Sequence, residues 1–192
     1  RIDIGTLAAA DQLDLLRVYG VTLWRMRDIK SPPKVLSEIG AQLDRNYPST
    51  NPWVNQELCR VLSKLDHPKV AAKTLKLLTA ALTQEEQLHY AYCLRVVTKG
   101  WTKELRTEYF SWFGKGLSYR GGASFLGFCK NIRKDAIARM PKADAAEIAE
   151  LLRTEPKAQA VTAIDKTRKF VKNWTVAELT PLLTKKTSGH NF

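Results

Sequence analysis

Three cysteines recur at nearly regular intervals along the chain, each in a similar sequence context. Cys59, Cys93 and Cys129 lie 34 and 36 residues apart, in the segments ELCRVL, AYCLRVV and GFCKNI. Leu16, in the segment DLLRVY, holds the equivalent position 43 residues before Cys59. Each segment places a small or medium-sized apolar residue ahead of a basic one. A recurring unit of this length indicates a structural repeat, in which neighbouring units bury their apolar faces against one another.

Apolar residues recur at helical spacing through most of the chain, and capping signals separate the periodic segments. Ser31-Pro32, Asn51-Pro52 and Thr102 are typical helix starts, and Thr83 with Glu86 has the spacing of a capping box. Convincing strand patterns are absent. We expect eight helices, over residues 13–26, 31–48, 51–65, 68–78, 83–100, 102–113, 122–141 and 144–153. Because the turns between them are short, the sequence predicts an all-α fold: a HEAT-like α-solenoid of antiparallel helical hairpins.

The character of the sequence changes after the predicted hairpins. We expect residues 1–155 to form the helical-repeat domain and residues 156–192 to form an extended tail, laid along the helices through Phe170, Val171 and Trp174. Within the tail, Thr175 and Glu178 have the spacing of a second capping box, which predicts a short helix ending near Leu183.

The number and spacing of the cysteines argue against disulfide, redox or metal chemistry. Three widely separated cysteines are neither a disulfide framework nor a zinc motif. A free cysteine behaves as a small hydrophobe, so we expect all three to pack in the core. His89 and Cys93 share a helix face, but two ligands without a third do not make a metal site. The chain has no C-x-x-C-H motif for attaching haem, and we expect neither a metal nor a cofactor in it.

Positive charge is concentrated in the second half of the chain. The formal net charge is +12, and Lys and Arg outnumber Asp and Glu by 11 to 3 in residues 95–142 and by 7 to 2 in residues 157–192. Such a surface favours an acidic partner, which could be nucleic acid, an anionic surface or an acidic protein face. The plain alternative is a solvated surface that keeps the protein soluble. No run approaches the ~18 apolar residues of a membrane-spanning helix, so we expect no membrane insertion.

The segment SYRGGASFLGFC, residues 118–129, has the composition most suggestive of a site. Its glycine and serine spacing does not fit a nucleophile elbow, a P-loop or a dinucleotide fingerprint. The remaining functional interpretation is a helix N-terminus beside an arginine, which can hold an anion. The alternative is that the glycines form a turn that lets two helices approach closely. We predict no catalytic residue, and the candidate surface for an anion or a partner consists of Arg120, Gly121, Gly122, Lys130, Arg133 and Lys134.

Aromatic and basic residues alternate between residues 101 and 120. Basic residues interleaved with aromatic ones can bind nucleic acid. Aromatic residues at helical spacing are more often core residues, and we expect these to be core. The aromatic residues concerned are Trp101, Tyr109, Trp112, Phe113 and Tyr119, beside Lys103, Arg106, Lys115 and Arg120.

Several long segments resemble a known family. They are LDLLRVY, NQELCRVLSKLDHPKVAAKTLKLL, TQEEQLHYAYCLRVVTKGWTKELRTEYFSWF and YRGGASFLGFCKNIRKDAIA. They are similar to the HEAT-like region of the large multidomain c-type cytochromes of planctomycete-type bacteria. FVKNWTVAEL and SGHNF resemble the lead-in to the C-terminal cytochrome c module of those proteins. The resemblance covers most of residues 10–140 and resumes at 170–192, while residues 157–169 match the family poorly.

The resemblance implies a connector domain in an extracytoplasmic (periplasmic) electron-transfer protein, with haem only in a downstream module. We therefore expect a non-enzymatic scaffold that positions a cytochrome c module or an acidic redox partner. The alternative is a basic HEAT-like domain that binds nucleic acid, of the kind found in some DNA glycosylases.

Overall fold

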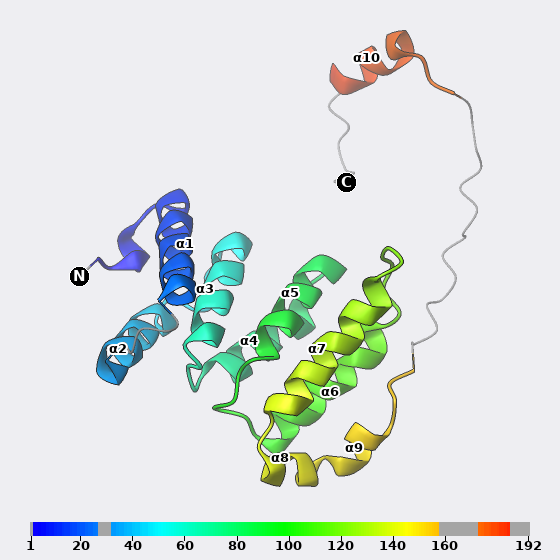
Figure 1. The fold of residues 1–192 in the computed structure, drawn as a ribbon. Coiled ribbons are helices and arrows are strands. Elements are labelled where there is room, and N and C mark those ends of the chain that lie inside the picture. The colour runs from blue at the N-terminus through cyan, green and yellow to red at the C-terminus, as the bar shows by residue number, and fades with distance from the viewer. Residues whose placement is uncertain (1, 27–31, 158–172, 185–192) are drawn as a thin grey trace. The chain divides into compact units, whose positions relative to one another are not determined.

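The computed structural model describes residues 2–26, 32–157 and 173–184 (Figure 1). It divides into two compact units, residues 1–160 and 161–192. The described residues form ten α-helices, a short 3-10 helix and no strand, which confirms the all-α prediction. The elements are η1 (Ile4–Thr6), α1 (Ala9–Arg25), α2 (Pro33–Asp44), α3 (Pro52–Lys64), α4 (Val70–Ala80), α5 (Gln84–Leu94), α6 (Lys103–Gly116), α7 (Phe125–Arg139), α8 (Lys142–Glu147), α9 (Ala149–Arg153) and α10 (Val176–Thr184).

In the first unit, the odd-numbered helices from α1 to α7 form a row. Helix α3 packs between α1 and α5, and α7 follows against α5 (Figure 1). The even-numbered helices pack beside this row: α2 and α4 against α3, α4 also against α5 and α6, and α6 against α7. Helix α9 packs against α6. Helices that are neighbours in the sequence, or next-but-one neighbours, therefore make most of the packing contacts.

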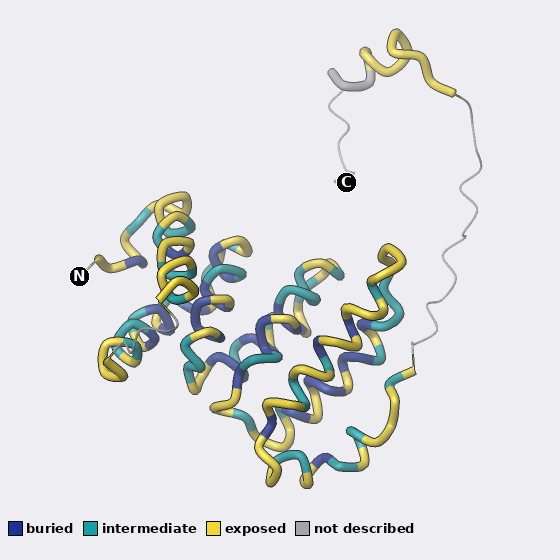
Figure 2. Tube along the Cα trace, viewed as in Figure 1, coloured by how far each residue is buried: buried dark blue, intermediate teal, exposed yellow. Residues whose placement is uncertain are grey.

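The repeated position of the sequence lies in the interior of each helix of this row. Leu16, Cys59 and Cys129 are fully buried, and Cys93 is 5% exposed. Buried and exposed stretches alternate along the helices of the first unit (Figure 2). The three cysteines are free thiols. The prediction that they pack in the core is confirmed, and each successive helix of the row presents one such residue to its neighbours.

Most predicted helix starts are confirmed by their caps. The side chain of Asn51 accepts hydrogen bonds from two backbone N–H groups of α3, and Thr83 and Thr102 each accept one at the start of α5 and α6. Helix α2 begins at Pro33, and Ser31, the expected cap, lies outside the described residues. The prediction that the fifth helix continues to residue 100 is wrong, because α5 ends at Leu94.

Asp66, in the loop between α3 and α4, binds the loop that follows α5. Its backbone is left-handed, with φ of 50°. Its carboxylate accepts hydrogen bonds from the Thr98 N–H at 2.7 Å, the Thr98 hydroxyl at 2.6 Å and the Lys99 N–H at 3.1 Å. The loop between α3 and α4 and the loop after α5 are in direct contact at Gly100, where a Cβ would lie 1.7 Å from the Pro68 carbonyl oxygen. The φ of Gly100 is 73°. This loop clamp draws residues 98–100 away from the helical path of α5.

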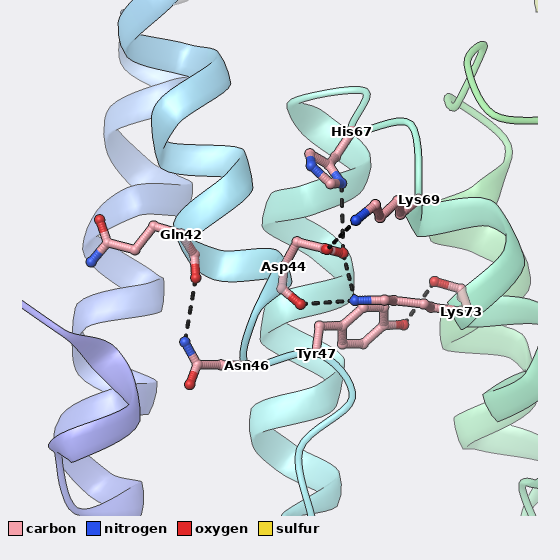
Figure 3. A network of polar contacts seen from close by, with 8 residues as sticks. Gln42, Asp44, Asn46, Tyr47, His67, Lys69 and Lys73 are labelled. Atoms are coloured by element: carbon pink, nitrogen blue, oxygen red, sulfur yellow. Dashed lines mark hydrogen bonds and ion pairs between the residues drawn. The ribbon is translucent and has the colours of Figure 1, made fainter.

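A second polar network joins the end of α2 to the start of α4 (Figure 3). The buried Asp44 carboxylate lies 2.7 Å from the Lys73 ammonium, which also donates to the Asp44 carbonyl at 2.8 Å. Lys69 lies 3.9 Å and His67 Nδ1 3.7 Å from the same carboxylate. Burial, together with the neighbouring Lys73 and Lys69, lowers the pKa of His67, although Asp44 opposes this. The network fixes the end of α2 to the start of α4.

A buried arginine connects α6 to α8. Arg106 is 4% exposed, pairs with Asp144 and lies over the ring of Trp101, 5.2 Å from its centroid. The single helix predicted over residues 144–153 is instead two short helices, α8 and α9, because the backbone leaves the helical conformation at Ile148, whose side chain is buried.

The aromatic residues of α6 are core residues, as predicted. Tyr109, Trp112 and Phe113 are between 1% and 9% exposed. The Tyr109 hydroxyl donates to the Ala91 carbonyl at 2.8 Å, and the Trp112 indole N–H donates to the Gln87 side-chain oxygen at 3.0 Å. Because their polar atoms are satisfied inside the protein, these rings are not a surface for stacking on a nucleic acid.

In the second unit, α10 begins at the predicted capping box. The Glu178 carboxylate accepts from the Thr175 N–H at 2.9 Å, and the Thr175 hydroxyl accepts from the Glu178 N–H at 3.4 Å. The expected extended path through Phe170 and Val171 lies outside the described residues. Among the residues that are described, no helix is both long enough and apolar enough to cross a membrane.

Candidate docking groove

A groove of about 490 Å³ lies between α1, α3 and α5 in the first unit. All three helices that form it belong to the row of odd-numbered helices. Four basic side chains and one acidic side chain line the groove, so its wall is positively charged. The charged residues are Arg17, Arg60, Lys64, Arg95 and Glu57. The volume is within the range typical of ligand-binding sites.

The three arginines of the groove come from the internal repeat. Arg17 and Arg60 directly follow the buried repeat position of α1 and α3, and Arg95 lies two residues after that of α5. The repeat therefore places one guanidinium on α1, one on α3 and one directly after the last residue of α5. We call Arg17, Arg60 and Arg95 the arginine ladder.

Each arginine of the ladder is oriented by one carboxylate. The pairs are Arg17 with Asp14 at 3.2 Å, Arg60 with Glu57 at 3.1 Å, and Arg95 with Asp135 of α7 at 3.4 Å. A guanidinium has five N–H donors, and one carboxylate accepts from at most two of them at once. Arg17 and Arg60 therefore keep donors for a further anion, whereas Arg95 also donates to the Tyr92 carbonyl.

Exposed aromatic side chains flank the ladder. Trp24 of α1 is 60% exposed and Tyr92 of α5 is 41% exposed, and both line the groove. The Arg95 guanidinium lies 3.4 Å from the centroid of the Tyr92 ring, and Phe128 of α7 stacks on Tyr92 at 5.7 Å. Large exposed rings beside cations mark a surface that binds a partner.

Three of the six residues predicted as a candidate site lie together elsewhere. Lys130, Arg133 and Lys134 of α7 line a cavity of about 450 Å³, together with Phe113 and Leu117. Arg133 also donates through Nη2 to the backbone carbonyls of residues 152 and 154, at 2.9 and 3.4 Å. This arginine therefore helps to hold the end of the first unit against α7.

The other three predicted residues belong to the exposed turn before α7 and do not line that cavity. The Gln84 side chain accepts from the Arg120 N–H at 3.2 Å and donates to the Arg120 carbonyl at 2.9 Å. A Cβ at Gly121 would lie 2.3 Å from the Phe125 ring, whereas one at Gly122 would meet no atom within 4 Å. Gly121 is therefore needed for the close approach of the turn to its own helix, which favours the structural interpretation of this segment.

The histidine and cysteine that share a face of α5 are part of the packing. His89 Nε2 donates to the Gln56 carbonyl at 2.9 Å, and the Cys93 sulfur lies 3.6 Å from the same nitrogen. Burial lowers the pKa of His89. Across the described part of the chain, no three His, Cys, Asp or Glu side chains are grouped so that they could hold a metal ion.

The groove was not identified as a site from the sequence. Its signal is present there, because each repeat segment carries a basic residue after the buried position. Trp24 and Tyr92 gave no such signal, since their spacing is the same as that of core residues. Comparisons of the chain with protein-family models, with curated proteins and with solved structures find no match.

Proposed function

We propose that the chain is a HEAT-like helical-repeat scaffold, without enzymatic activity, that binds an acidic protein surface through the groove between α1, α3 and α5. By its resemblance to the multidomain cytochromes, we further propose that it works outside the cytoplasm. Its partner there would be a cytochrome c module or another acidic redox protein, and the haem would be supplied by that partner.

The observation that carries the proposal is the arginine ladder. Arg17, Arg60 and Arg95 line the same groove, and each lies beside one carboxylate, so three guanidinium groups are brought together there. Trp24 and Tyr92 add exposed apolar area beside them. Arginine and aromatic residues are the side chains most enriched at the centres of protein interfaces.

The test is binding to an acidic c-type cytochrome domain by isothermal titration calorimetry. We expect the affinity to fall at least about tenfold between roughly 0.01 M and 0.3 M salt, because paired surface charges are screened. Arg60→Gln should weaken binding about threefold to tenfold, as expected for one charge-assisted contact. Arg153→Gln is the matched control, because Arg153 pairs with Glu150 three residues away as Arg60 pairs with Glu57, but lies on α9. Absence of binding at low salt, or equal losses for the two variants, would contradict the proposal.

Nucleic acid is the second candidate, and the exposed rings beside Arg95 favour it. Single-stranded nucleic acids bind grooves that combine cations with stacking aromatic side chains. If the docking proposal holds, single-stranded and duplex DNA should bind no more tightly than heparin does. A clear preference for DNA over heparin, lost in Tyr92→Ala, would favour the second candidate.

A further inference from the structure

We infer that the cavity lined by Lys130, Arg133 and Lys134 binds a small aliphatic carboxylate, such as a medium-chain fatty acid. The carboxylate lies beside the lysines, and the hydrocarbon chain lies against the apolar lining. The inference goes beyond the proposed function, because none of the residues that line this cavity lines the groove between α1, α3 and α5.

The first argument is the charge of the cavity. Its three cationic side chains come from neighbouring turns of α7, where residues three and four apart share a helix face. The other charged lining residue is Glu155, so positive charge is in excess. Among the described residues, no carboxylate forms an ion pair with Lys130 or Lys134. Both ammonium groups therefore remain able to pair with the carboxylate of a ligand.

The second argument is an unmet donor on Arg133. Its Nη2 donates to the carbonyls of residues 152 and 154, which holds the side chain at the cavity. Its Nε is buried and has no hydrogen-bond partner among the described residues. A buried donor without an acceptor is unfavourable. An anion bound beside Arg133 is therefore attracted by this guanidinium as well as by the two lysines.

The third argument is the order of polar and apolar residues from the mouth of the cavity inward. Lys130 and Lys134 are exposed, whereas Leu117 and Ile137 are half-buried and Phe113 is 1% exposed. The cations therefore lie at the mouth and the apolar side chains lie deeper. A ligand that fits this order has a charged head and an apolar body. Small-molecule sites typically combine an apolar lining with a few polar groups that orient the ligand, and a volume of about 450 Å³ is within their usual range.

Other anions use only part of this lining. An inorganic phosphate would contact the cations and leave the apolar side chains without a partner. A nucleotide would need a ring on which its base could stack. Phe113 is the one aromatic residue among the described residues that line the cavity, and it is too deeply buried to offer a face.

The test is an NMR titration of the intact chain, labelled with ¹⁵N, at low salt and neutral pH. The two principal probes are sodium octanoate and octan-1-ol, which have the same chain length but differ in charge. We expect saturable shifts at residue 117 and at residues 129–138, with octanoate bound at least about fivefold more tightly than octanol. Octanoate should also bind about tenfold more tightly than hexanoate, since each buried methylene group raises affinity up to about fourfold.

Three variants locate the head group. Lys134→Gln should weaken octanoate binding about twofold to fivefold and leave octanol binding unchanged. Glu155→Gln should strengthen octanoate binding by about twofold, because it removes a like charge from the cavity. Lys76→Gln is the matched control, because Lys76 is an exposed lysine of α4 that does not line the cavity. Arg133 is kept in all variants, since its hydrogen bonds to residues 152 and 154 hold the chain.

Each alternative result overturns the inference. Equal affinity for octanoate and octanol shows that the cations do not contribute. Equal affinity for octanoate, hexanoate and inorganic phosphate shows a surface that binds anions without using the apolar lining. Equal losses in Lys134→Gln and Lys76→Gln show attraction to the net charge of the protein. An absence of saturable shifts removes the site altogether. None of these results bears on the docking proposal, and circular dichroism establishes that each variant is folded.

Discussion

The loop clamp formed by Asp66 makes a graded prediction for the free energy of unfolding. Its carboxylate accepts three hydrogen bonds from residues 98 and 99, and its backbone is left-handed. Three substitutions separate the two contributions. Asp66→Asn keeps an acceptor and tolerates the left-handed backbone, Asp66→Gly keeps only the backbone freedom, and Asp66→Ala keeps neither.

The magnitudes follow from the contacts. A hydrogen bond to a charged group contributes about 1.5–3 kcal/mol when it is well sheltered. The loop of Asp66 is partly exposed and one carboxylate serves all three bonds, so we expect about 2 kcal/mol for their joint loss in Asp66→Gly. A left-handed alanine costs about 1–2 kcal/mol more, which brings Asp66→Ala to about 3–4 kcal/mol. Asp66→Asn should cost about 1 kcal/mol, because it loses the charge but keeps an oxygen that can accept.

Urea unfolding followed by circular dichroism measures this series at neutral pH. Although partial burial raises it, the hydrogen bonds from Thr98 and Lys99 keep the pKa of Asp66 below its ordinary value of 3.8. The carboxylate therefore stabilises the fold fully above about pH 4, and its contribution is lost as the pH falls below that value. Equal stability of the Gly and Ala variants would refute the backbone argument. A loss below about 0.5 kcal/mol in all three would refute the clamp itself.

Three further predictions concern the packing around the row of helices. Gly100→Ala should lower the free energy of unfolding by about 3 kcal/mol, because the new Cβ would overlap the Pro68 carbonyl and the φ of residue 100 is positive. A loss below about 1 kcal/mol, measured by urea unfolding, would show that the loop moves to accommodate the Cβ. Asp144→Ala should cost about 2–3 kcal/mol, since it leaves the Arg106 guanidinium buried without its carboxylate. Calorimetry of the double variant Arg106→Met/Asp144→Ala should recover part of that loss, and no recovery would show that packing, not charge, is responsible. Burial lowers the pKa of His89 below its ordinary value of 6.5, so His89 binds a proton more readily in the unfolded chain than in the folded one. The free energy of unfolding should therefore fall as the pH drops below about 6.5, and it should stay level above that pH. His89→Gln should flatten this part of the pH profile, and an unchanged slope would assign it to another group.

Helix starts were predictable from the sequence because a cap acts within its own turn. Asn51, Thr102 and Thr175 each accept from an N–H two or three residues along the chain, so a short segment contains the whole interaction. Helix ends depended on distant partners. Helix α5 stops at Leu94 because residues 98 and 99 bind Asp66, a contact that no local pattern reveals.

The candidate groove was likewise predictable only where its features depend on local sequence. The repeat predicted which residues are buried, and it carried the arginines without showing that they face a common groove. Which aromatic residues are exposed depends on which helix faces are covered, so Trp112 and Trp24 cannot be distinguished by spacing. Similarly, Lys130 and Lys134 share a helix face and line one cavity. Arg120 lies in a turn whose backbone is hydrogen-bonded to Gln84, and it does not line that cavity.

The three buried thiols also provide the chain with its own probes of local opening. A buried thiol reacts with a disulfide reagent only when the surrounding structure opens, so its reaction rate measures the free energy of that opening. Three successive helices of the row each carry one of these thiols: Cys59 on α3, Cys93 on α5 and Cys129 on α7. Variants that keep a single cysteine would therefore report the rate at which each of these helices opens. In a stack stabilised by contacts between neighbours, fraying proceeds from the ends, and Cys129 should react before Cys59. A partner bound across α1, α3 and α5 should slow Cys59 and Cys93 and leave Cys129 unchanged.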